Sequence, residues 1–225
     1  MNPQRGIALF DLDHTLLGGD ATYEWMQFLM RRGIVERADC EPRLDRFYED
    51  YGQGSLDIHA FLRFDFEPLA RHSRSQLEAW RDEYLAESIA PILLPKAHEL
   101  IAWHHERGDI TAIVTAANSF ITAPIARLYG AQHLLASEPA VDAQGEFTGE
   151  VAGEPCFHDG KVTRLAAWLA ERGDALADFS SSHFYGDSQS DVPLLALVTH
   201  PVVVHPDAAL AELAGSRGWP IISLR

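Results

Sequence analysis

Polar side chains that can do chemistry stand directly after three short apolar runs of this sequence. The runs occupy residues 6–10, 110–114 and, more weakly, 182–185, and such brief apolar runs predict buried strands. Because ligands of an open parallel sheet bind beyond the carboxyl ends of its strands, we expect the residues after the runs to meet at one sheet edge. These residues are Asp11, Asp13 and Thr15 after the first run, Thr115 and Ala116 after the second, and Asp187, Ser188 and Asp191 after the third.

Carboxylates gathered at one edge need a positive partner. Two unit charges 4 Å apart repel by about 4 kcal/mol at an effective dielectric constant near 20. A hard divalent cation removes this repulsion, and an all-oxygen donor set suits Mg²⁺. Because Mg²⁺ takes one or two carboxylates plus a phosphate oxygen, another aspartate stays free to attack phosphorus. The pattern therefore predicts Mg²⁺-dependent phosphoryl transfer on a small phosphorylated metabolite.

Attack of a carboxylate on a phosphate dianion also needs charge neutralisation near the nucleophile. Lys161, in a helix predicted over residues 159–171, would supply it together with the metal. Thr115 and the backbone N–H groups after it, including that of Ala116, would hold the phosphoryl oxygens. Asp13, the second carboxylate of the pair that begins with Asp11, would act as general acid and base, since crowded negative charge raises the pKa of a carboxyl group.

The elements that position these residues alternate between strands and helices. Further short apolar runs lie at residues 202–204 and 221–222, and residues 138–151 are typical of a hairpin. This alternation predicts an α/β fold with a doubly wound, mostly parallel, Rossmann-like sheet. The predicted helices span residues 96–107, 119–129, 159–171, 192–198 and 208–214.

One interval is too long for this alternation of strands and helices. About 100 residues separate Thr15 from Thr115, whereas a βαβ unit needs roughly 30. The surplus, residues 20–90, is helical in pattern and holds 11 of the 22 aromatic residues, enough for a small core of its own. We predict a helical cap domain at 20–90, inserted after the first strand of a core domain at 1–19 and 91–225; the alternative is extra helices packed on the sheet. Aromatic residues such as Tyr23, Phe61 and Phe64 are candidates to close over a substrate.

Composition excludes several classes of protein. The 225 residues are 47% hydrophobic, as in ordinary globular domains, and their net charge of −15 argues against nucleic acid or an anionic membrane as a partner. No apolar run approaches the roughly 18 residues of a membrane helix, and no signal peptide is evident at the N-terminus. We therefore expect a cytoplasmic protein, either a monomer or a homodimer.

Zinc and disulfide chemistry are not predicted. Cys40 and Cys156 lie far apart and have no metal-type spacing. His98, His104 and His105 share one predicted helix without an i, i+4 pair and a third ligand, so we expect them on the surface.

Four motifs in this order resemble the haloacid dehalogenase superfamily of phosphohydrolases, and the resemblance covers nearly the whole chain. It implies a Rossmann-like core with a cap, bound Mg²⁺ and an aspartyl-phosphate intermediate. The motifs are Asp11-Leu12-Asp13-His14-Thr15, then Thr115 after an apolar strand, then Lys161, then Gly186-Asp187-Ser188-Gln189-Ser190-Asp191.

The same resemblance implies a role for each motif residue. Asp11 is similar to the nucleophile, and Asp13 to the general acid and base whose backbone carbonyl also contacts Mg²⁺. The remaining roles are an orienting hydroxyl for Thr15, phosphate ligands for Thr115, Lys161 and Ser188, a direct metal ligand for Asp187, and an outer-shell or second metal ligand for Asp191.

The insert resembles the cap of the phosphoserine-phosphatase-like subgroup, which includes histidinol-phosphatase-like proteins. Asp20 stands where that subgroup has an acidic residue, usually Glu, that binds the substrate's ammonium; it is equally placed to stabilise a helix N-terminus. The second motif reads Thr115-Ala116-Ala117 where phosphoserine phosphatases have Ser-Gly-Gly, which narrows the site. We expect an ammonium-bearing substrate such as histidinol phosphate or phosphoserine. The alternatives are a phosphomutase, or a phosphatase of a sugar phosphate or nucleotide.

Overall fold

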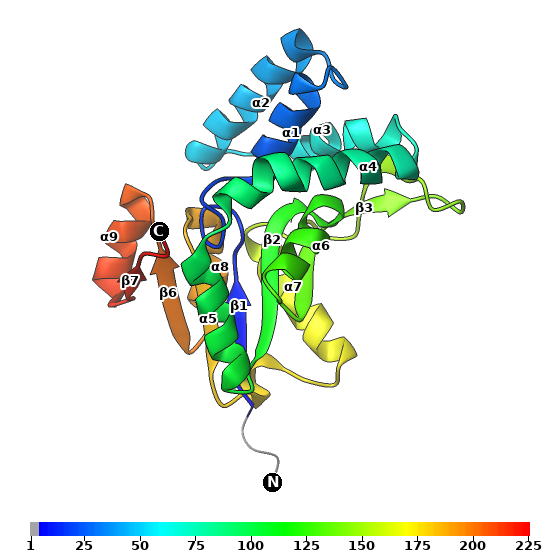
Figure 1. Ribbon diagram of the computed structural model, residues 1–225. Coiled ribbons are helices and arrows are strands. Elements are labelled where there is room, and N and C mark those ends of the chain that lie inside the picture. Colours follow the sequence, from blue (N-terminus) through cyan, green and yellow to red (C-terminus); the bar gives the residue numbers. More distant parts are fainter. Residues whose placement is uncertain (1–4) are drawn as a thin grey trace.

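The computed structural model describes residues 5–225, which form a seven-stranded sheet with helices on both faces (Figure 1). The strand order is β4-β3-β2-β1-β5-β6-β7, and every neighbouring pair is parallel except β3 and β4. This confirms the predicted fold class. The strands are β1 (Ile7–Phe10), β2 (Ile110–Asn118), β3 (His133–Val141), β4 (Phe147–Ala152), β5 (Ser182–Gly186), β6 (His200–Val204) and β7 (Ile221–Ile222).

Strand β1 is the middle strand of the sheet, and its four apolar residues are buried on both faces. Its side chains alternate: Ala8 and Phe10 join the apolar cluster on one face, whereas Ile7 and Leu9 join the cluster on the other. Helices from both sides of the sheet complete these two clusters, as a doubly wound fold requires. The helices are α5 (Pro95–Glu106) and α6 (Ser119–Leu128) on the first face, and α7 (Asp159–Glu171), α8 (Val192–Leu195) and α9 (Ala208–Arg217) on the second.

Residues 20–90 form a layer of helices beyond the carboxyl ends of the strands, drawn in blue and cyan in Figure 1. The segments that enter and leave the layer lie side by side, because Leu17 and Leu93 form an antiparallel bridge. Apolar side chains of the layer share one continuous cluster with a face of the sheet, so the division into core and cap stays a prediction. The helices are α1 (Ala21–Arg31), α2 (Arg37–Gly52), α3 (Ile58–Ala70) and α4 (Arg74–Tyr84), followed by a π-helical turn at Leu85–Ile89 and a 3₁₀ turn at Ala90–Ile92.

Two strands are longer than the pattern predicted. The hairpin at 138–151 exists, but β3 begins at His133 because its first half pairs in parallel with β2 before its second half pairs with β4. Strand β2 continues to Asn118, past a shift of register after Val114. A period-2 pattern does not reveal a strand whose two halves serve different partners.

The expectation for His104 was wrong. Its side chain is fully buried, with Nδ1 2.7 Å from Asp109 Oδ2 and Nε2 2.9 Å from the hydroxyl of Tyr185. Beside it, the ring of His183 stacks on that of His200 with centroids 4.4 Å apart. Within residues 5–225, no helix is both long and apolar enough to cross a membrane.

We predict that His183 makes the fold acid-sensitive. Burial, and then the charges of His104 and His200, lower the pKa of His183 from 6.5 to about 4. The unfolded chain therefore binds this proton at higher pH than the folded chain, so the stability that His183 contributes is present above about pH 6.5 and is lost as pH falls toward about 4. His183→Gln should show a smaller fall in unfolding free energy than the natural protein between about pH 7 and about pH 5 in urea denaturation.

His59→Gln, at an exposed position on α3, is the matched control and should keep the natural pH dependence. Identical slopes for His183→Gln and the natural protein would contradict the prediction.

Candidate active site

The predicted acidic residues come together at the point where the strand order reverses. Asp11 follows β1 and Asp187 follows β5, and these two strands are direct neighbours. From β1 the chain proceeds to β2 and β3 on one side, and it returns to β5 and β6 on the other. Such a switch point is where ligands bind in an open α/β sheet.

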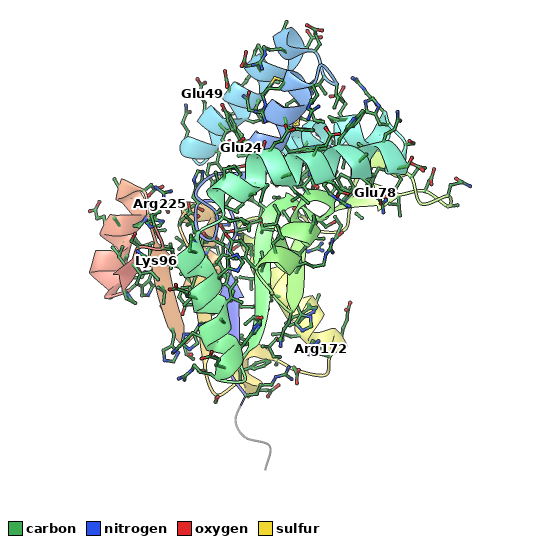
Figure 2. All side chains as sticks on the ribbon, in the orientation of Figure 1. Glu24, Glu49, Glu78, Lys96, Arg172 and Arg225 are labelled. Atoms are coloured by element: carbon green, nitrogen blue, oxygen red, sulfur yellow. The ribbon has the colours of Figure 1, made fainter. Side chains whose placement is uncertain are left out.

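Lys161 links the two strand ends. Most charged side chains lie on the surface, as Glu49 and Arg172 do in Figure 2, but Lys161 is only 1% exposed. Its Nζ lies 2.6 Å from Asp11 Oδ1 and 2.6 Å from Asp191 Oδ1. Burial alone would lower the pKa of Lys161, but the charges of the two aspartates raise it well above 10.5. Lys161 is therefore a buried cation that binds both acids.

Backbone N–H groups hold the carboxylate of Asp191 in place. It is fully buried, and its Oδ2 accepts hydrogen bonds from the N–H of Asp187 at 3.1 Å and of Ser188 at 3.3 Å. A Cβ atom at Gly186 would lie 2.6 Å from this oxygen. Glycine is therefore required at 186 so that the carboxylate can approach the strand end this closely.

Three carboxylates form a group that suits a hard cation. One oxygen each from Asp11, Asp187 and Asp191 lies within 4.8 Å of the other two. The Thr15 hydroxyl, which is fully buried, donates to Asp187 Oδ1 at 3.4 Å. An all-oxygen set of this kind fits Mg²⁺ rather than a softer metal. The side-chain carboxylate of Asp13 is not part of this group, and contact of its backbone carbonyl with the metal stays a prediction.

Burial and neighbouring negative charge raise the pKa values of Asp11 and Asp187. Burial raises the pKa of Asp11 from 3.8 to about 7, even though Lys161 opposes the shift. Burial, and then the charges of Asp11 and Asp191, raise the pKa of Asp187 well above 3.8. One lysine does not balance this many carboxylates, so the site has room for further positive charge.

Asp13 and Asp20 both meet the N-terminus of α1. Oδ1 of Asp13 accepts a hydrogen bond from the N–H of Ala21 at 2.6 Å, and Asp20 caps the helix by accepting from the N–H of Tyr23 at 2.8 Å. Burial, and then the charges of Asp20 and Asp11, raise the pKa of Asp13 well above 3.8. Asp13 is thus a carboxyl group that is ready to hold a proton.

Thr115 does not line the cavity beside the acids, and neither do Thr15 and Asp191. Thr115 is fully buried, and its Oγ1 accepts a hydrogen bond from the N–H of Ala117 at 3.2 Å instead of lining the open cavity. Ala116 and Ala117 do line the cavity. The side chain of Thr115 therefore holds the irregular end of β2, whose backbone follows it.

A cavity of about 170 Å³ lies between the sheet edge and the helical layer. Its floor is acidic, and its roof consists of aromatic and aliphatic side chains from α2, α3 and the loop between them. Phe61 lines it as predicted, but Tyr23 and Phe64 do not. His14, Ala117 and Ser190 line it from within the quoted motifs, although no role was predicted for the side chains of His14 and Ser190. The lining residues that sequence reasoning did not single out are Thr22, Phe47, Tyr48, Tyr51, Leu56, Ile58 and Phe157.

A signal for part of this roof exists in the sequence. Phe47, Tyr48 and Tyr51 are spaced so that two of them, at i and i+4, share one face of α2. The spacing identifies a face but not what that face covers, because only the tertiary structure places α2 over the acids.

Comparisons with known proteins agree with this geometry. A family model described as haloacid dehalogenase-like hydrolase matches residues 8–196. The chain is 40% identical over 221 residues to a histidinol-phosphatase of Neisseria meningitidis serogroup C (strain 8013), an alignment that covers 98% of this chain and 100% of that protein. A crystal structure of a protein with unknown function from Bordetella pertussis Tohama I gives a TM-score of 0.94 at 45% identity and covers 99% of this chain and 100% of that one.

A more distant solved structure shares the fold. A phosphoserine phosphatase captured as a phospho-aspartyl intermediate analogue gives a TM-score of 0.70 at 20% identity and covers 99% of this chain and 95% of that one. Together with these comparisons, the doubly wound sheet places the chain among the hydrolases that have a Rossmann-like α/β core. The chain belongs to the haloacid dehalogenase-like hydrolase family, which confirms the resemblance carried by its motifs, and it is a phosphatase.

We predict that removing the charge of Lys161 destabilises the protein. Lys161→Met would leave Asp11 and Asp191 buried without their counter-charge, and removing one partner of a buried ion pair costs about 3–5 kcal/mol. Urea denaturation with a chelator present should show a loss of about 3 kcal/mol, and added Mg²⁺ should recover part of it by binding the folded state.

Lys96→Met, which replaces the chain's other lysine at an exposed position, is the control and should change stability little. Unchanged stability of Lys161→Met in chelator would show that Lys161 does not balance these acids.

Proposed function

We propose that this phosphatase is a Mg²⁺-dependent phosphomonoesterase that forms an aspartyl-phosphate on Asp11. The observation that carries the proposal is the acidic group in which one oxygen each from Asp11, Asp187 and Asp191 lies within 4.8 Å of the others, while Lys161 bridges Asp11 and Asp191. A nucleophilic carboxylate, a cation beside it and a hard-metal donor set are what attack on a phosphate dianion requires.

The metal-holding residues would be Asp11, Asp187 and Asp191, with the backbone carbonyl of Asp13 as a further oxygen. When bound, Mg²⁺ would polarise the phosphoryl group and offset its repulsion from the carboxylate. Asp191 is fully buried and already accepts three hydrogen bonds from Lys161 and the backbone, which supports an outer position for it.

The protein's own residues divide the remaining work. Lys161 holds Oδ1 of Asp11, so we assign attack on phosphorus to Oδ2 of that residue. Asp13, with its raised pKa, gives a proton to the leaving alkoxide and later accepts one from the water that attacks the aspartyl-phosphate. Thr115 holds the irregular end of β2 so that the N–H of Ala116, together with the Ser188 hydroxyl, binds the phosphoryl oxygens.

The cavity favours a small substrate that carries positive charge and an apolar or flat body. Asp11, Asp13, Asp20 and Asp187 line it, whereas Lys161 is the sole Lys or Arg among the described lining residues. The roof offers aromatic rings that attract both flat groups and cations. Histidinol phosphate combines an imidazole ring and an ammonium, and the name of the N. meningitidis relative supports it over phosphoserine.

We assign residues 20–90 the role of a cap over this cavity. Tyr51 of α2 supports the assignment because its ring approaches that of Phe157, with centroids 6.3 Å apart, and both side chains line the cavity. Closure of this kind excludes water from a reactive phosphoenzyme.

Asp11→Asn tests the mechanism. We expect it to remove nearly all Mg²⁺-dependent phosphate release, because an amide oxygen is a far weaker nucleophile than a carboxylate. The measurement is free phosphate from a panel of histidinol phosphate, phosphoserine, sugar phosphates and nucleotides, with isomerised sugar phosphate assayed in parallel to detect a phosphomutase.

Asp45→Asn, at an exposed position on α2, is the control and should behave as the natural protein. Substantial Mg²⁺-dependent release by Asp11→Asn would rule out the covalent route.

Asp20→Asn tests recognition of the ammonium. Asparagine caps a helix as well as aspartate does, so this change removes the charge while keeping the start of α1. A hydrogen bond to a charged group is worth about 1.5–3 kcal/mol, so kcat/KM for histidinol phosphate should fall about tenfold or more relative to glycerol phosphate. Equal losses of kcat/KM on the two substrates would contradict a role of Asp20 in ammonium binding, since Asp20 would then act only through Asp13 and α1.

A further inference from the structure

Two fully buried polar side chains join the helical layer to the end of a catalytic strand. Nδ2 of Asn118, the last residue of β2, donates a hydrogen bond to Oδ2 of Asp65 on α3 at 2.7 Å. Both residues are 0% exposed, and they are 53 positions apart in the sequence. Neither belongs to the motifs, and the proposed mechanism uses neither.

Asn118 anchors the end of the segment to which we assign phosphate binding. It directly follows Thr115, Ala116 and Ala117, where the pairing of β2 with β3 shifts register. Its Oδ1 accepts from the N–H of Ile121 at 3.1 Å and caps α6. The side chain of Asn118 is thus held by α6 through its oxygen and by α3 through its nitrogen.

Asp65 anchors a wall of the cavity. Phe61, one helical turn earlier on the same face of α3, lines the cavity, and so does Ile58 at the start of that helix. Ala116 and Ala117 line it from the sheet. The bond between Asp65 and Asn118 therefore connects the roof at Phe61 with the backbone at Ala117.

The pair resists separation because Asp65 has nothing else to bind. Its Oδ1 is buried with no hydrogen-bond partner among residues 5–225. If α3 moved away from β2, both oxygens of a desolvated carboxyl group would be left unsatisfied. Apolar residues would pack α3 at least as well without this penalty, so packing alone does not account for the pair.

We propose that Asp65 and Asn118 are positioning residues, which hold the Thr115–Ala117 segment against the cavity roof in the geometry that binds phosphate. The proposal rests on the phosphate-binding part of the proposed function. It adds that the affinity of this segment for phosphate depends on a helix of the insert rather than on the sheet alone.

The test exchanges the two side chains. In Asn118→Asp two carboxyl groups face each other, and in Asp65→Ala the amide loses its partner. The double variant Asp65→Asn/Asn118→Asp restores one hydrogen bond with its direction reversed, and aspartate at 118 still caps α6. The readouts are the affinity for inorganic phosphate by calorimetry with Mg²⁺, hydrogen exchange of residues 115–121, kcat/KM, and the melting temperature.

Each single variant should bind inorganic phosphate about tenfold more weakly and exchange faster over residues 115–121, because small displacements of a positioning group carry large costs. The double variant should return to within about threefold of the natural protein on both measures. The control is Glu146→Gln, which weakens the contact of the β3–β4 hairpin with the N–H of Arg74 away from the cavity and should change neither measure.

Natural phosphate affinity and exchange in the folded single variants would overturn the proposal. So would a double variant as impaired as Asp65→Ala, a comparison that still decides the matter if Asn118→Asp does not fold. Because phosphate binding and exchange need no turnover, absence of esterase activity in the natural protein would refute the proposed function separately from this inference.

Discussion

The contact on which the site depends is the bridge that Lys161 makes between Asp11 and Asp191 at 2.6 Å each. A buried ammonium is costly unless it is paired, and two buried carboxylates are costly unless they are balanced, so each group requires the others. The bridge ties together β1, the loop after β5 and the first turn of α7, which reach this point from opposite ends of the chain. The pairing of β1 with β5 brings two of these three segments to one place.

Backbone geometry serves the same bridge. Asp191 can stand close to Lys161 because the N–H groups of Asp187 and Ser188 hold its other oxygen, and because Gly186 leaves room for it. Asp11 is in turn held by its N–H, which donates to the carbonyl of Tyr185 at 2.8 Å. The protein's own residues make these contacts, so under the proposed mechanism the acids would be preorganised for the reaction.

Much of this site follows from sequence because it obeys one simple rule. A short apolar run that ends in Asp or Thr marks the carboxyl end of a buried strand, and parallel strands deliver such ends to one edge. That rule correctly predicts that Asp11 and Asp187 lie close together, but it does not predict the direction in which each side chain beyond the strand end points. Asp13 turns to the N–H of Ala21, and Thr115 turns inward to the N–H of Ala117, because unsatisfied backbone donors lie within reach there. The burial of His104 could not be predicted from its helix either, because its partners Asp109 and Tyr185 lie outside that helix.

The charge of the cavity explains how so acidic a protein can act on an anion. With a net charge of −15, the chain as a whole repels phosphate, and Lys161 is already occupied by two acids. A substrate that brings its own positive charge arrives with less repulsion, and Asp20 lies where such a charge is balanced. If the substrate is the cationic phosphate ester proposed above, the same acids that repel a plain phosphate ester would favour it, so discrimination between substrates would rest on charge and the aromatic roof would have to fit only the uncharged part of the molecule.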